Sequence, residues 1–128
     1  MYDIIIEKCG EERHEMKAVA SITKDGINVY VGGGEKAHIG SIVISKPRPS
    51  LKGDGSISCT TSVHNLVGHK DDGIAVPMAE SICKRTGRVV VVTAGIHIEG
   101  AMQEDIRIFK ENGVKLTEKL LKRALCDS

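Results

Sequence analysis

Aromatic residues are scarce in this sequence, which has no tryptophan, one phenylalanine and two tyrosines among its 128 residues. Proteins that bind single-stranded nucleic acids stack the bases on aromatic faces, so this class is disfavoured. The sequence also lacks an excess of charge of one sign, because 18 lysines and arginines stand against 17 acidic residues. Duplex-binding proteins usually carry a clear basic excess, so we expect no nucleic-acid partner.

Long apolar runs are missing as well. The longest apolar stretch, Val89 to Val92 with its flanks, is too short to span a bilayer. The amino-terminal segment MYDIIIEKCGEE has an acid at Asp3 and no long apolar core, unlike a signal peptide. We therefore expect no membrane partner and a cytoplasmic protein. The length suits a single domain over residues 1–128, with a core of its own.

The four cysteines are too far apart in sequence to form a CxxC pair. Structural zinc and iron–sulfur sites usually need closer spacing, so we expect no metal. In the cytoplasm, these cysteines are expected to be reduced thiols, some of them buried as small apolar residues. They are Cys9, Cys59, Cys83 and Cys126.

Alternating apolar and polar residues predict a sheet that comes before most of the helical sequence. Two of the alternating runs are joined through Lys24-Asp25-Gly26, which predicts a β-hairpin. Pro47 and Pro49 are expected to end a later strand, because proline cannot donate to a sheet ladder. The five expected strands before the first helix cover residues 2–8, 16–22, 27–31, 38–45 and 56–64.

Two helical patterns follow, separated by one more strand. The first helix is expected to begin at a capping Asp71 or Asp72, to hold Pro77 near its first turn and to end at Gly87. Arg88 to Ile98 is nearly continuous in β-branched residues, which is typical of a covered or central strand. The second helix carries an apolar stripe and could bend or break at Asn112-Gly113; the stripe is formed by Met102, Ile106, Phe109, Leu116 and Leu120.

The element order is therefore β-β-β-β-β-α-β-α. Hairpins first and helices late predict an α+β fold: a mainly antiparallel six-stranded sheet with two helices on one face. If helices cover one face, the Ile57, Cys59, Thr61 and Val63 side of the fifth strand should be the buried one.

Polar chemistry gathers between Lys46 and Asp72. Prolines on both sides of Arg48 stiffen the backbone, so its guanidinium is held ready for a phosphate or carboxylate; a plain surface turn is an equal alternative. Ser58, Thr60, Ser62 and His64 share one face of a strand, either as ligand contacts or as an ordinary solvated face. His69 and Lys70 precede a helix start, where backbone N–H groups favour anions.

Two hypotheses about the histidines remain open. His97 and Glu99 flank Ile98 on one side of a strand, and with His38 and His64 they could form a metal site if the fold brought them together. A small enzyme using His64, His97 or Glu99 would need at least two of these side chains to converge in one pocket.

Three segments, HIGSIVISKPRPS, SCTTSV and GHKDDGIAVPMAESICKRTGRVVVVTAGIHI, occur in this order and resemble the small LpdD-like proteins, which are described as prenylated-flavin chaperones associated with gallate-type decarboxylases. The match runs from about His38 to Phe109, and the pair GHKDD and AGIHI is its most specific part. The resemblance also implies the fold of small proteasome-assembly chaperones, which are often paired into dimers.

The resemblance implies an accessory protein rather than an enzyme. It would carry prenylated FMN, or FMN, from a flavin prenyltransferase to a UbiD-like decarboxylase, and it would form a homodimer. On this hypothesis, Arg48, Ser50 and Lys70 suit the phosphate. Thr60, Ser62 and His64 could reach the ribityl or ring oxygens, and His69 is a further candidate contact. The alternative is an assembly chaperone that acts through protein–protein contacts without a small-molecule ligand.

Overall fold

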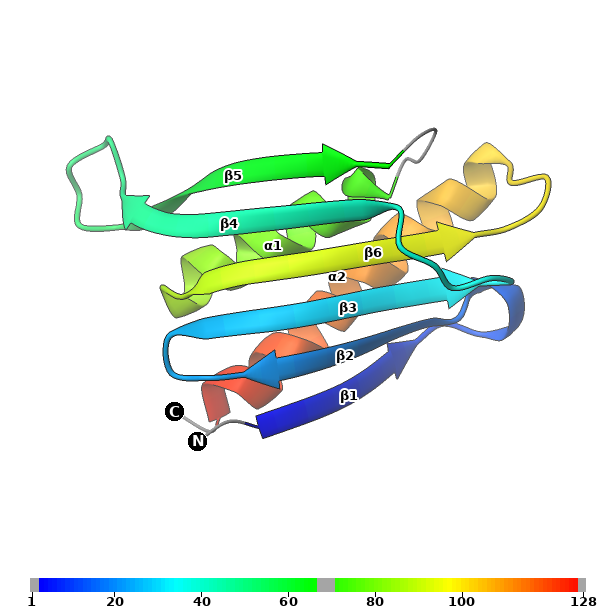
Figure 1. The fold of residues 1–128 in the computed structure, drawn as a ribbon, viewed down its shortest axis with the longest axis horizontal. Helices are drawn as coiled ribbons and strands as arrows, with labels where there is room; N and C mark the ends of the chain where they lie inside the picture. Colours follow the sequence, from blue (N-terminus) through cyan, green and yellow to red (C-terminus); the bar gives the residue numbers. More distant parts are fainter. Residues whose placement is uncertain (1–2, 67–70, 127–128) are drawn as a thin grey trace.

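The structure, a computed structural model, describes residues 3–66 and 71–126. A sheet of six strands lies in front of two helices in the view of Figure 1. The strands are β1 (Asp3–Cys9), β2 (Met16–Ile22), β3 (Gly26–Gly34), β4 (Ser41–Pro49), β5 (Ile57–Asn65) and β6 (Val89–His97); the helices are α1 (Asp72–Thr86) and α2 (Gln103–Cys126), and a short 3-10 helix spans Glu12–His14.

The spatial order of the strands is β1-β2-β3-β6-β4-β5. The α+β class, the element order and the placement of both helices on one face are confirmed. One pairing departs from the expected antiparallel pattern, because β6 lies parallel to β3 and antiparallel to β4. The sheet is mixed because the apolar β6 inserts between β3 and β4, which are consecutive in sequence.

The core lies between the sheet and the helices. Along β2, the residues at alternate positions Met16, Ala18 and Ala20 are buried, and the same alternation continues in β3 with Val29 and Val31. This two-residue period is the one the sequence predicts for strands with one covered face. The helices cover that face only, so the other face of the sheet, called here the helix-free face, carries no further layer within the described part of the chain.

Helix α1 differs from the predicted helix in two ways. Asp71 occupies the N-cap position but makes no side-chain cap bond, because its own backbone is already helical (φ −68°, ψ −15°). Pro77 lies in the helix interior rather than the first turn. It therefore cannot donate a backbone N–H to the Gly73 carbonyl four residues earlier. The end of α1 is as expected, with Gly87 in the left-handed region and its N–H bonded to the Cys83 carbonyl.

Helix α2 is continuous through Gly113, where the sequence suggested a possible break. Gly113 is buried against α1, and a Cβ added there would stand 3.4 Å from Ile74 Cγ2. The two helices therefore pack closely at this point. At the start of α2, Asp105 accepts the Met102 backbone N–H (2.9 Å), which satisfies one of the free N–H groups of the first turn.

Candidate functional site

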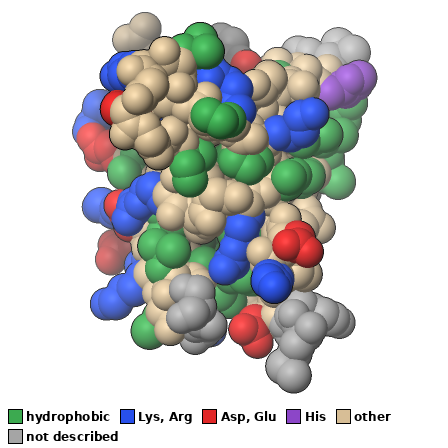
Figure 2. All heavy atoms as spheres, turned by 90° about the vertical axis from the view of Figure 1, so that its left-hand side faces the viewer, with side chains coloured by type: hydrophobic (Ala, Val, Ile, Leu, Met, Phe, Trp, Pro, Cys, Tyr) green, Lys and Arg blue, Asp and Glu red, His purple; other side chains and the backbone are tan. Residues whose placement is uncertain are grey.

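Three of the residues predicted to bind a ligand lie together at the β4–β5 turn. The Arg48 Nε donates to Thr60 Oγ1 (3.1 Å) across the two strands. Arg48 and Ser50 line a shallow hollow formed by this turn. Figure 2 looks onto this end of the molecule, where basic side chains are scattered among hydrophobic, uncharged and acidic ones and form no separate basic patch.

The other predicted ligand residues are not brought into that hollow. Ser62 and His64 follow Thr60 along β5 on the helix-free face, where both are exposed. The far end of β5, next to His64, pairs with Ser41 of β4. Ser41 and Arg48 lie at opposite ends of β4, about 23 Å apart at 3.3 Å per residue. His69 and Lys70 lie outside the described residues. Ligand binding by these residues stays a prediction.

Half of the burial expected for β5 is observed. Cys59 is buried against α1, but Ile57 and Val63 are each 45% exposed. The reason is that β5 is an edge strand, and α1 covers only its middle. Thr61 marks the covered part, since its hydroxyl donates to Glu80 Oε2 (2.7 Å) of α1 and lies 2.9 Å from Ser45 Oγ.

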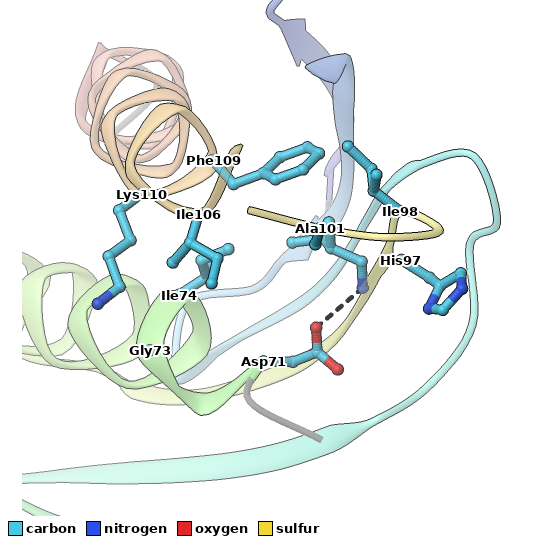
Figure 3. A pocket seen from close by; sticks show the side chains of 10 residues that line it. Asp71, Gly73, Ile74, His97, Ile98, Ala101, Ile106, Phe109 and Lys110 are labelled. Carbon is cyan, nitrogen blue, oxygen red and sulfur yellow. Dashed lines mark hydrogen bonds between the residues drawn. The ribbon is translucent and has the colours of Figure 1, made fainter. Parts of the chain in front are cut away.

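A different hollow, of about 250 Å³, lies at the opposite end of the sheet, where β6 ends. Its walls come from three elements that are distant in sequence: the first turn of α1, the segment after β6 and the first half of α2 (Figure 3). We call it the β6-end hollow. Most of its lining is apolar; these residues are Ile74, Ile96, Ile98, Ala101, Ile106 and Phe109.

The carboxylate of Asp71 fixes one side of this hollow. It is 6% exposed, and its Oδ1 accepts the backbone N–H of Ile96 (3.0 Å), the bond drawn in Figure 3. The two motifs GHKDD and AGIHI therefore meet, since Asp71 belongs to the first and Ile96 to the second. This bond ties the start of α1 to the end of β6.

Polar groups border the hollow on the α1 side. Lys110 of α2 extends along the first turn of α1, and a Cβ added at Gly73 would stand 3.4 Å from Lys110 Cε and 3.9 Å from Nζ. A cation therefore lies next to a helix N-terminus, where the macrodipole also favours anions. Because Pro77 supplies no N–H, the Gly73 carbonyl lacks the donor that the residue four positions later normally provides.

Histidines gather on the other side. The rings of His38 and His97 are 6.4 Å apart, and His38 Nε2 lies 3.6 Å from Asp71 Oδ2. The Tyr30 hydroxyl donates to the His38 carbonyl (3.0 Å). Partial burial, and then the negative charge of Asp71, raise the pKa of Tyr30.

The structure brings together only some of the residues in the histidine metal-site and enzyme hypotheses. His97 Nε2 lies 3.4 Å from Glu99 Oε2, but Glu99 is 92% exposed and does not line the hollow. His64 lies on β5, apart from both. Among residues 3–66 and 71–126, no group of three or more histidine, cysteine or acidic side chains could hold a metal ion.

The paired motifs are the one usable sign of the β6-end hollow in the amino-acid sequence. The walls of the hollow are not predictable in this way, because Ile106 and Phe109 belong to the apolar stripe of α2, and such a stripe is typical of core positions. Periodicity identifies the stripe but not the part of it that no other element covers.

The helix-free face carries large exposed apolar side chains on several strands. One row of paired residues crosses all six strands, with Ile6, Val19, Tyr30, Thr93, Ile42 and His64 side by side. The exposed fractions of Ile4 and Ile6 are 62% and 59%, and that of Ile44 is 40%. Antiparallel sheets with one solvated face normally carry polar residues there, so this face is typical of an interaction surface.

Comparison with known protein families shows which family the chain belongs to. The model of the prenylated flavin chaperone LpdD-like domain matches residues 10–125. The chain belongs to this family. The paired motifs that meet at the β6-end hollow lie within the matched range, as do all the residues that line it.

A solved structure shares the fold. A chain from the crystal structure of a chaperone complex for yeast 20S proteasome assembly is 19% identical, with a TM-score of 0.64 over 97% of this LpdD-like chain and 98% of that chain. At this identity, the likeness shows the fold alone. No curated protein matches the sequence. None of the helices in the described part of the chain is long and apolar enough to cross a membrane.

Proposed function

We propose that this LpdD-like protein binds phosphorylated prenylated flavin, prenylated FMN, in the β6-end hollow and delivers it to a UbiD-like decarboxylase. It would receive the flavin from the prenyltransferase and would act as a homodimer without transforming its ligand. The match to the flavin chaperone family over residues 10–125 is the observation that carries the proposal.

The residues of the β6-end hollow suit such a ligand. Ile98, Ile106 and Phe109 line it with apolar side chains that suit the ring system. Lys110 beside the start of α1 suits the phosphate. The absence of a side chain at Gly73 lets Lys110 lie beside the start of α1.

The size of the hollow supports a carrier role. At about 250 Å³ it is just below the range of roughly 300–1,000 Å³ that is usual for small-molecule sites. A flavin would therefore be only partly enclosed, and a partly exposed ligand can pass to a second protein. A groove between α1 and α2 shares Gly73, Ile74 and Lys110 with the hollow and could hold the remainder.

Replacing Lys110 by alanine tests the phosphate contact. Lys110→Ala should weaken binding of prenylated FMN by roughly 10- to 100-fold, the scale of a lost hydrogen bond to a charged group. Dephosphorylated prenylated flavin should bind equally to both proteins. The measurement is a fluorescence titration, with Lys115→Ala as a control, because Lys115 is exposed on the same helix but does not line the hollow.

The same titration decides between the two candidate phosphate sites. If the phosphate binds at the β4–β5 turn, Arg48→Ala rather than Lys110→Ala should cause the loss, at a cost of roughly 1.5–3 kcal/mol. Unchanged affinity in both variants would argue against a phosphate contact at either end of the sheet.

We assign the helix-free face to the partner enzyme. A six-stranded sheet with strands of seven to nine residues presents roughly 700–800 Å², close to the ~800 Å² that each partner buries in a standard interface. The strand positions on this face carry four basic side chains and no acidic one. A second copy would stack like charges, whereas an acid-rimmed partner would pair with them; the four are Lys8, Lys17, Lys46 and Arg48.

A charged side chain in the apolar row tests this assignment. Ile6→Asp should abolish co-purification with the decarboxylase and leave the flavin affinity unchanged. Val114→Asp is the matched control, because Val114 is 63% exposed but lies on α2, on the other side of the molecule. Equal effects of both variants would contradict the assignment.

The helix-free face also favours one alternative function, an assembly chaperone that acts through protein contacts and has no small-molecule ligand. A flavin-binding measurement distinguishes the two functions. A protein that binds the enzyme through this face but gives no saturable response to prenylated flavin would be such a chaperone.

A further inference from the structure

The two edges of the sheet are protected very differently. At the β1 edge, Lys119 Nζ donates to the Lys8 carbonyl (2.7 Å), and Arg123 pairs with Glu7 (3.0 Å). Both cations come from α2. Charged side chains and a covering helix are the usual means by which proteins prevent an edge strand from pairing with another chain.

Within residues 3–66 and 71–126, the β5 edge has none of these protections. Its sequence ISCTTSVHN contains no proline, lysine, arginine or acidic residue. It pairs with β4 residue for residue from Asn65 to Ile57, so no bulge twists it away. Within the described ranges, no side chain hydrogen-bonds to its outward backbone groups. A flat, uncharged edge of nine residues is a template for another strand.

The pattern of hydrogen bonds shows which backbone groups point outward. The Leu66 N–H bonds to the Gly40 carbonyl (2.8 Å), and the Ser50 N–H bonds to the Ser56 carbonyl (3.0 Å). In an antiparallel ladder these pairs recur every second residue, so the even-numbered residues of β5 bond to β4. The outward N–H and C=O groups therefore belong to residues 57, 59, 61 and 63.

We propose that β5 pairs antiparallel with β5 of a second copy of this chain, with the two-fold axis at Thr60. In this register, Ile57 lies opposite Val63 of the second copy on each side of the axis. Both side chains are 45% exposed in a single copy, and each pair buries two of them. An isologous contact requires such a self-complementary surface.

The remaining pairs are compatible with this register. Ser58 faces Ser62 of the second copy, and Cys59 faces Thr61, so no like charges stand opposite each other. The nearest cations on the helix-free face, Lys46 and Arg48, lie on β4. Equivalent β4 strands would be three strand spacings apart, about 14 Å, and exposed charges at that distance are largely screened.

This pairing leaves both proposed binding surfaces accessible. The two sheets join edge to edge into one continuous sheet, so their helix-free faces lie side by side. The β6-end hollow is bounded by α1, α2 and the end of β6 and does not include β5. The proposal rests on the homodimer of the proposed function and specifies its interface, but it can be tested separately from flavin binding and from the decarboxylase.

Sedimentation of the full-length protein tests the pairing. The wild type should sediment as a dimer, and Val63→Pro should be a monomer, because proline removes an outward N–H without touching the bonds to β4. Val63→Thr keeps the shape and the N–H, so it should remain a dimer. Ile6→Asp, on the helix-free face, should also remain a dimer.

A cysteine at the axis gives a second readout that does not depend on the fold of a proline variant. Thr60 would form a non-hydrogen-bonded pair with itself, with Cα atoms about 4.5 Å apart, within the range of disulfides. In a Cys126→Ser background, Thr60→Cys should form a disulfide-linked dimer on mild oxidation. Ser62→Cys, whose partner is Ser58, should not.

Three results would overturn the proposal. The first is a wild-type protein that stays monomeric over a 100-fold range of concentration up to the highest soluble one. The second is a Thr60→Cys protein that does not cross-link above the level of Ser62→Cys. The third is a dimer that the Ile6→Asp substitution dissociates. The last result would place the dimer interface on the helix-free face.

Discussion

Gly95→Ala should destabilise the protein more than any other single methyl group added to the sheet. A Cβ at Gly95 would stand 1.7 Å from the His38 carbonyl oxygen and 2.2 Å from its carbonyl carbon. These are backbone atoms, so no side chain can rotate away. We expect a loss of about 3 kcal/mol or more in the free energy of unfolding, measured by urea denaturation.

The reason for the close approach is the segment that crosses from β3 to β4. It is fixed to β6 at both ends, by the Glu35 N–H to the His97 carbonyl and by the Gly40 N–H to the Ala94 carbonyl, each 2.8 Å. This crossing brings His38 to Asp71. The variant should therefore disturb the β6-end hollow as well as the core.

Gly26→Ala is the control for this prediction. Gly26 begins β3, and its added Cβ would meet only the Val89 carbonyl oxygen at 3.6 Å and Thr23 Oγ1 at 3.9 Å, which are ordinary contacts. This variant should change the stability by less than about 0.5 kcal/mol. If Gly95→Ala were as stable as Gly26→Ala, the crossing segment would not lie where the structure places it.

Ile106→Glu should cause the second large effect, on ligand binding rather than on stability. Ile106 lines the β6-end hollow and is 40% exposed, so the fold tolerates a polar side chain there. A carboxylate in this wall would remove apolar contact with the flavin ring and repel its phosphate. The affinity for prenylated FMN should fall by about 100-fold, as measured by fluorescence titration.

Leu125→Glu provides the matched control. Leu125 lies on the same helix and is 41% exposed, yet it does not line the hollow. The two variants add the same charge at equal exposure, so nonspecific repulsion of the phosphate would weaken binding equally in both. A loss confined to Ile106→Glu would identify the hollow as the site, and equal affinities would exclude it.

Much of the fold could be predicted from alternation and turn signals. The two-residue period of Met16 to Ile22 and of Ile27 to Val31, with a turn at Gly26, placed the β2–β3 hairpin correctly. The unbroken run at Val89 to Val92 predicted a central strand. The parallel pairing of β3 with β6 was not predictable. Strands that are consecutive in sequence usually pair as hairpins, and the residues of one strand do not indicate which other strand it pairs with.

The candidate site was harder to read than the fold. Sequence reasoning selected charged and hydroxyl residues such as Arg48 and Thr60, which do contact each other. The hollow that the fold forms is lined mostly by apolar residues, and its polar side chains are Asp71, His97 and Lys110. Such a site emerges only when three distant segments are packed together.

Backbone NMR of the wild-type protein during a titration with prenylated FMN tests the central claim most directly. We expect saturable shifts centred on the amides of Gly73, Ile74, Ile98, Phe109 and Lys110, which border the β6-end hollow. The amides of the β4–β5 turn should remain unchanged. Saturable shifts centred on Arg48 and Thr60, or no shifts at saturating ligand, would contradict binding in this hollow.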